Sequence, residues 1–209
     1  MYIPKAFEVT DPNTIRAFVE AHSFATLVTS LEAEMFATRL PLILDFDASG
    51  KGTLTGHVAR ANPHWRSFDG ECPALAMFDG PHAYVSPNWY ATSPAVPTWN
   101  YATVHIYGAP HIIDDAGRVE AIVDRLSTIH EAGMPTTWRE TLPADFKAKL
   151  LKGIVGFEMA IDRFEAKFKL GQNRPLEDQI GAVEHLEKSS DCAERELARL
   201  TRNHLRLNP

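Results

Sequence analysis

The sequence predicts a mainly β protein with peripheral helices, folded as a closed or nearly closed barrel. Three observations support this fold class. Six or seven short segments are rich in β-branched and apolar residues, long helical patterns are few, and the connections between the segments are rich in Gly and Pro. A β-sandwich would fit the same pattern almost as well.

Composition and charge narrow the class of protein. The chain has 209 residues, of which 44% are hydrophobic and 23% charged, as is ordinary for a soluble globular protein. The net charge of −6 and the pI of about 5.8 disfavour a protein that binds nucleic acid mainly by neutralising phosphates. Cys72 and Cys192 share no metal-ligand spacing, which is typical of free thiols in a reducing cytoplasm. Because no segment resembles a signal peptide or a membrane span, we expect a cytoplasmic protein without a membrane partner.

The first elements follow from capping residues and periodicity. A helix is expected to begin after Asp11, because Asp is a good N-cap and Pro12 suits the first helical turn. Short β-rich segments punctuated by Glu, Asp, Ser and Gly come next. The elements expected after the helix are three consecutive antiparallel strands at residues 24–30, 34–44 and 52–58 and a short helical turn at 60–68.

In the second half, glycine and proline mark the breaks. Residues 73–86 are expected to form two strands around a tight turn at Asp79-Gly80, because Gly tolerates positive φ. A bend or bulge is expected at Gly108-Ala109-Pro110. The other expected elements are a surface loop at 86–98, strands at 98–113 and 153–170, helices at 115–131 and 143–152, and helical sequence from Pro175 to the end.

The segment from Thr55 to Trp65 is the first candidate binding site. Arg60 and Asn62 lie where a strand turns into a short helix, so free backbone N–H groups and a guanidinium could bind a phosphate together. The ordinary interpretation is that Arg60 is an exposed residue and Asn62 is an N-cap. The local sequence favours this ordinary interpretation.

Arg39 is the second candidate, because it interrupts the apolar strand 34–44. A charge that faces the core needs a partner, and a bound anion would provide one. Simple alternation along the strand would instead place Arg39 on the outward face, which is the more common situation. Thr38 is either a sheet residue or a hydroxyl available to a ligand.

Two further segments carry groups that could contact a ligand. Trp99 and Tyr101 could stack on a planar cofactor and Asn100 could offer a hydrogen bond, although aromatic residues in strands are more often part of the core. The end of the last strand carries several donors that could reach phosphate, hydroxyl or carbonyl groups, although they could equally be solvated. These donors are Lys169, Gln172, Asn173 and Arg174.

Six segments, taken together and in order, are similar to one known family. The chain from Met1 to about Arg174 resembles the PaiB family of FMN-binding negative transcriptional regulators. This resemblance implies a split β-barrel of the kind found in pyridoxamine-phosphate oxidases, and a homodimer with FMN at the subunit interface. The segments are "MYIPKAF", "GHVARANP", "GPHAYVSPNWY", "VPTWNYATVHIYG", "LLKGIVGFEMAI" and "KFKLGQNR".

The resemblance also implies domain bounds and roles for individual residues. Residues 1–174 would form the FMN-binding split barrel, and 175–209 a C-terminal helical extension packed on the same domain. Arg39 would lie near the flavin and Arg60 with Asn62 at the phosphate loop, while Lys169 and Gln172 would reach the flavin from the partner subunit. The residues expected to bind FMN are Thr38, Arg39, Leu40, Thr55, Gly56, His57, Arg60, Asn62, Trp99, Asn100, Lys169 and Gln172.

Three functions are compatible with this sequence. The leading hypothesis is an FMN-carrying negative transcriptional regulator without catalytic residues or a metal. The second is a flavin-dependent oxidoreductase for a small molecule, with Thr38, His57 and Trp99 as candidate donors. Against an oxidase, residues 59–62 are Ala-Arg-Ala-Asn where the oxidases carry a denser Ser-Arg-Lys cluster. The third is haem binding or breakdown, for which the barrel-region histidines are His57, His64, His82, His105 and His111.

Direct DNA binding has one possible source in this sequence. Arg195, Arg199, Arg202 and Arg206 fall close to one face of the last predicted helix and could meet a phosphate backbone. They could equally pair with Glu194 and Glu196 and keep the helix soluble, which is the more common role of a charged helical face. DNA is therefore only a weakly supported partner.

Overall fold

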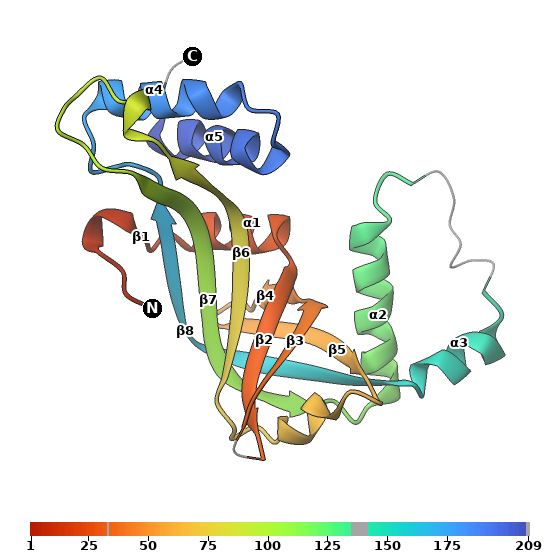
Figure 1. The fold of residues 1–209 in the computed structure, drawn as a ribbon. Coiled ribbons are helices and arrows are strands. Elements are labelled where there is room, and N and C mark those ends of the chain that lie inside the picture. The colour runs from red at the N-terminus through yellow and green to blue at the C-terminus, as the bar shows by residue number, and fades with distance from the viewer. Residues whose placement is uncertain (33, 135–141, 208–209) are drawn as a thin grey trace. The chain divides into compact units, whose positions relative to one another are not determined.

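The computed structural model describes residues 1–209 except 33, 135–141 and 208–209 (Figure 1). The described residues form one eight-stranded sheet with peripheral helices, so the predicted fold class, mainly β with helices around it, is confirmed. In chain order the elements are η1 Lys5–Phe7, β1 Glu8–Val9, α1 Pro12–Ala21, β2 Phe24–Leu31, β3 Glu34–Pro41, β4 Ile43–Phe46, β5 Gly52–Ala59, η2 Pro63–Ser67, β6 Ala74–Val85, η3 Pro87–Trp89, β7 Thr98–Ile112, α2 Ala116–His130, α3 Ala144–Leu151, β8 Ile154–Lys169, α4 Leu176–Glu187 and α5 Cys192–Leu205.

The strand order in the sheet is β3-β2-β6-β7-β8-β5-β4, and β1 pairs with β8. Strands β2 and β3 pair antiparallel with Thr26 opposite Arg39, and β5 and β8 pair antiparallel with His57 opposite Gly156. By their internal contacts the residues form two compact units. The first unit comprises Met1–Phe18, Asp79–Val104 and Glu165–Pro209, and the second comprises Val19–Phe78 and His105–Phe164.

Helix α1 forms as its capping sequence predicts. The Asp11 carboxylate accepts a hydrogen bond from the backbone N–H of Thr14 at 2.8 Å, which satisfies one of the free donors at the helix start. The apolar residues that recur at helical spacing, Ile15, Phe18 and Val19, are all buried. Among the described residues, no helix is long and apolar enough to cross a membrane.

The single strand predicted at 34–44 is wrong, because the structure has two strands there with different partners. Strand β3 pairs with β2, whereas β4 pairs with β5. Pro41 ends β3 and has no backbone N–H for a further ladder bond. Leu42 leaves the ladder: its N–H donates to Ser23 O at 2.9 Å, and its side chain is buried.

The turn predicted at Asp79-Gly80 is also wrong, because β6 runs through both residues as one strand. Gly80 does not have positive φ. A Cβ at this position would lie 2.7 Å from the ring of Phe18, so the glycine permits close approach of α1 and does not reverse the chain. Gly108, where a bend or bulge was expected, lies within the continuous strand β7, and a Cβ there would lie 2.2 Å from Ala160 O.

Each unit has its own apolar packing. In the second unit α2 lies over β5, and the buried residues Ile43, Ile113, Val119, Ile122 and Leu126 form one cluster. In the first unit α4 and α5 lie side by side (Figure 1). They confirm the helical structure predicted from Pro175 onward, except at residues 208–209, which lie outside the described part. Arg202 of α5 pairs with Glu187 of α4.

Candidate functional site

The residues expected to bind FMN belong to both units. The second unit holds Thr38, Arg39, Leu40, Thr55, Gly56, His57, Arg60 and Asn62, and the first holds Trp99, Asn100, Lys169 and Gln172.

A hydrogen-bonded network joins β3 to the short helix η2. Asn62 caps η2 by accepting from His64 N at 3.1 Å, and its Nδ2 donates to Thr38 Oγ1 at 3.0 Å. Nδ1 of His64 lies 2.8 Å from the same Thr38 oxygen. The structure therefore brings Thr38 and Asn62 together, although they are 24 residues apart in sequence. Their polar groups fix the loop that carries Arg60.

His64 is the centre of this network, and no sequence pattern distinguishes it from the other histidines of the barrel region. Its side chain is 0% exposed, and its Nε2 lies 2.8 Å from Thr29 Oγ1, which in turn lies 2.8 Å from Ser67 Oγ. Burial lowers the pKa of His64 to about 4, so the ring is neutral at neutral pH. Because threonine hydroxyls engage both ring nitrogens, neither is available to a haem iron. The Asn62-Pro63 cap that precedes it is the only sequence signal for its position.

Arg60 is fixed at the end of β5. Its Nε and Nη2 donate to Lys152 O and Ile154 O at 2.8 Å each, where α3 leads into β8. The guanidinium lines a pocket of about 620 Å³, within the size range of ligand pockets. Other lining residues include Trp65, Glu120, Lys152, Ile154 and Gly156. The ordinary interpretation of Arg60 as an exposed residue holds in part, since it is exposed but also held in place.

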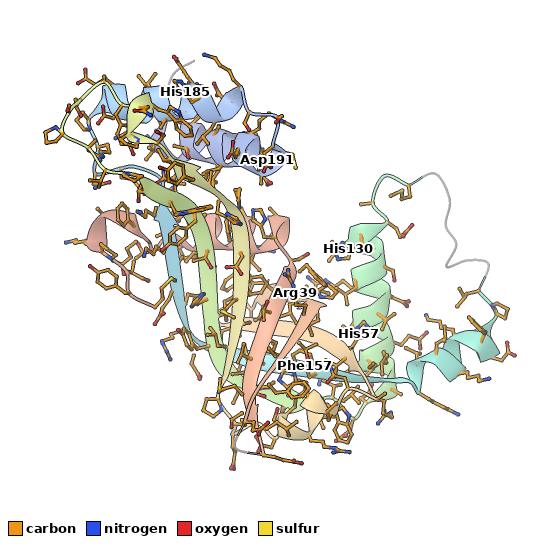
Figure 2. The ribbon with its side chains drawn as sticks, viewed as in Figure 1. Arg39, His57, His130, Phe157, His185 and Asp191 are labelled. Atoms are coloured by element: carbon orange, nitrogen blue, oxygen red, sulfur yellow. The ribbon has the colours of Figure 1, made fainter. Side chains whose placement is uncertain are left out.

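Arg39 of β3, labelled in Figure 2, is exposed. Its Nη2 donates to Phe24 O at 3.3 Å, and its guanidinium lies 4.8 Å from the centre of the Phe24 ring. The next residue, Leu40, is buried. Alternation along the strand therefore accounts for Arg39, and its charge does not face the core.

The β5 segment Thr55-Gly56-His57 combines a close backbone contact with a free polar atom. A Cβ on Gly56 would lie 2.6 Å from Leu42 Cδ2, so the glycine serves packing. Nδ1 of His57 is buried and has no hydrogen-bond partner, and burial lowers the pKa of this ring. His57 lies beside α2 (Figure 2) and lines an apolar pocket of about 170 Å³. An unsatisfied buried atom at a pocket indicates a ligand or water partner.

The first unit presents an aromatic surface on β6 and β7. Trp99 is 53% exposed, so the interpretation of this residue as core is wrong. Its ring lies 5.7 Å from the His82 ring and 6.3 Å from the Tyr84 ring. Asn100, the next residue, is only 4% exposed, and its Oδ1 has no hydrogen-bond partner.

Lys169 and Gln172, at the end of β8, have different roles. Nζ of Lys169 donates to Trp99 O at 2.8 Å and to Thr98 Oγ1, which ties β8 to the start of β7. Burial lowers the pKa of this lysine. Gln172 accepts from Leu170 N at 2.7 Å and donates to Phe168 O, so its amide closes the turn in which it lies.

Comparison with known proteins defines the class. Solved structures with the same fold include the flavocytochrome Anf3 from Azotobacter vinelandii (TM-score 0.62, 16% identity, covering 81% of this chain and 73% of that chain). They also include the FAD and heme binding protein from Mycobacterium smegmatis (TM-score 0.57, 18% identity, 84% and 79%). The fold is thus the split barrel of flavin-binding proteins, as expected.

The family follows from sequence similarity. Residues 1–163 match the family described as "Putative FMN-binding domain". The chain is 36% identical over 207 residues to the "Protease synthase and sporulation protein PAI 2" of Bacillus subtilis, covering 99% of both chains. The chain belongs to this FMN-binding family and is PaiB-like, so the predicted resemblance and the predicted cofactor, FMN, are both confirmed.

The described residues fit such a cofactor. The pocket at Arg60 has the size of a ligand site, and a guanidinium at its edge suits a phosphate. In the same unit the buried His57 Nδ1 has no hydrogen-bond partner. In the first unit, taken by itself, Asn100 Oδ1 is also buried without a partner, and the exposed Trp99 ring offers a stacking surface. Among the described residues, no cluster of His, Cys, Asp and Glu could hold a metal ion.

Proposed function

We propose that the protein is an FMN-binding negative transcriptional regulator that acts as a homodimer. The observation that supports FMN binding best is the fixed guanidinium of Arg60 at the edge of a pocket of about 620 Å³. The regulatory role is supported by the Bacillus subtilis relative, which is named as a protease synthase and sporulation protein.

In this proposal most polar residues of the site position FMN and do not act as acids or bases. Arg60 receives the phosphate, and the Thr38–Asn62 hydrogen bond holds the loop on which Arg60 lies. In the second unit His57 offers a hydrogen bond from a buried atom. In the first unit Asn100 offers a buried oxygen, and Trp99 offers an exposed ring for stacking on a flavin. Bound flavin would supply any redox chemistry. An oxidoreductase remains the alternative, since Thr38 and His57 could equally orient a substrate.

The homodimer is proposed to hold FMN at the subunit interface, with Lys169 and Gln172 contributed by the partner. The exposed aromatic surface formed by His82, Tyr84 and Trp99 supports the proposal, because such a surface could pack against the partner subunit. A ligand shared by two subunits stabilises the dimer, so dimerisation would respond to FMN concentration. We propose cytoplasmic action, in keeping with the free thiols of Cys72 and Cys192.

Direct contact with DNA is a weaker part of the proposal. Arg195 and Arg199 of α5 and its C-cap residue Arg206 are exposed. Arg202 is committed to Glu187, which leaves fewer cations on that face for a phosphate backbone. Regulation through another protein or through the state of the flavin is therefore equally compatible with this helix.

The test is an FMN titration of the wild type, Arg60→Ala and the control Arg199→Ala, followed by visible absorption. We expect one FMN per protomer and about tenfold or greater weakening in Arg60→Ala alone, because charge-assisted hydrogen bonds are worth about 1.5–3 kcal/mol. Addition of NADPH under anaerobic conditions should leave the flavin oxidised. Rapid reduction would favour the oxidoreductase, and absence of FMN binding with a Soret band after hemin addition would favour haem.

A further inference from the structure

We infer that helix α4 positions the Trp99–Asn100 segment by clamping the loop 86–97 that precedes it. The clamp consists of Asp178, Gly181 and His185 on α4. The inference rests on the proposed function, in which Trp99 and Asn100 contact FMN. It gives the C-terminal hairpin, formed by the helices α4 and α5, a role in ligand binding, although the family match ends at residue 163.

Asp178 makes the polar contact of the clamp. This side chain is 0% exposed, and it accepts from Thr92 N at 2.9 Å and from Thr92 Oγ1 at 2.6 Å. Burial alone would raise the pKa of Asp178, but the hydrogen bonds from Thr92 hold it below its ordinary value. The group is therefore a buried anion, and a buried anion requires its donors in place. Arg174 Nη1, at 4.0 Å from Asp178 Oδ2, adds a cationic contact.

Gly181 and His185 lie one and two turns further along the same face of α4. A Cβ on Gly181 would lie 2.2 Å from Trp89 O, so only glycine allows the helix to approach the loop this closely. The His185 ring stacks on the Trp89 ring at 5.3 Å with an interplanar angle of 8° (His185 is labelled in Figure 2). The helix therefore holds the loop through a polar, a backbone and an aromatic contact.

The restraint extends from the loop to the start of β7. Only residues 93–97 separate Thr92 from Thr98, and Pro94 and Pro97 among them have fixed φ. At the far end, Lys169 holds Thr98 Oγ1 and Trp99 O. The stretch from Thr92 to Trp99 is thus held at both ends by the segment 169–185. Displacement of Thr92 would be transmitted to Trp99, so Asp178 is a positioning residue.

The experiment compares Asp178→Asn with Asp191→Asn. Asp191 also accepts a hydrogen bond in this part of the chain, but from Ala193 N, as the N-cap of α5. Thr92→Val removes the hydroxyl from the other side and serves as a second variant if Asp178→Asn does not fold. Hydrogen exchange of the amides at 90–99 is measured without FMN, and FMN affinity is then measured by titration.

We expect faster exchange at 90–99 by about tenfold or more in Asp178→Asn and Thr92→Val, and no change in Asp191→Asn. FMN affinity should fall by about two- to tenfold in the same two variants, because ligand binding must then order the segment. Unchanged exchange would overturn the clamp. Faster exchange with wild-type FMN affinity would overturn the positioning role, provided that Arg60→Ala weakens binding. No FMN binding by the wild type would refute both the proposed function and this inference.

Discussion

Lowering the pH from 7 to 4 should destabilise the protein through His64. In the unfolded chain this ring titrates near pH 6.5, whereas burial lowers its pKa to about 4 in the folded protein. Between these values the unfolded state binds a proton that the folded state does not, so the free energy of unfolding falls as the pH falls. The difference corresponds to about 3 kcal/mol, lost between pH 6.5 and 4 and fully present above pH 6.5.

The assay is urea unfolding at several pH values for the wild type and His64→Gln. Glutamine keeps hydrogen-bonding groups near Thr29 and Thr38 but does not titrate. Burial also lowers the pKa of His57 and His204, so both proteins will lose stability toward pH 4. The His64 contribution is the difference between the two pH profiles. Parallel profiles, with no difference in slope between pH 6.5 and 4, would refute the assignment of His64 as a buried neutral ring.

Two further predictions concern packing and hydrogen bonding. Thr38→Val should lower the free energy of unfolding by about 1–3 kcal/mol in urea, because the buried His64 loses the hydroxyl partner of its Nδ1. Thr53→Val on β5 is the control, and equal effects of both changes would contradict the network. Gly108→Ala should cost about 3 kcal/mol or more in thermal unfolding, since its Cβ would meet Ala160 O at 2.2 Å. A Tm within about 2 °C of the wild type would contradict this prediction, because β7 and β8 would then be able to move apart at Gly108.

Local signals were sufficient for most of the fold. Periodicity and capping predicted α1 from Asp11 and the two long strands β7 and β8, because these elements are set by residues close in sequence. The wrong predictions concern places where the local structure is determined by contacts with residues distant in sequence. Gly80 resembles a turn glycine in sequence, but its role is set by the ring of Phe18. The division of 34–44 depends on the different partners of β3 and β4, which no local pattern encodes.

For the candidate site, the sequence predicted the roles of some single residues but not the partners with which their side chains form hydrogen bonds. The N-cap role of Asn62 follows from the sequence, whereas its bond to Thr38 depends on pairing across the sheet. Arg60 was expected to be either exposed or phosphate-binding, and its hydrogen bonds to Lys152 O and Ile154 O could not be foreseen. The exposure of Trp99 was also missed, because strand aromatics are usually buried. The assignment of these residues to FMN stays a prediction.

The chain passes between its two units after Phe18, Phe78, Val104 and Phe164, so neither unit is one continuous piece of sequence. The stretch that matches the family model, residues 1–163, ends within β8 and before the segment Glu165–Pro209 of the first unit. A gene fragment cut to that stretch would encode Met1–Phe18 and Asp79–Val104 without the strand and helices against which they fold. Truncations, fusions and domain exchanges of this protein should therefore keep helices α4 and α5, although the family match ends before them.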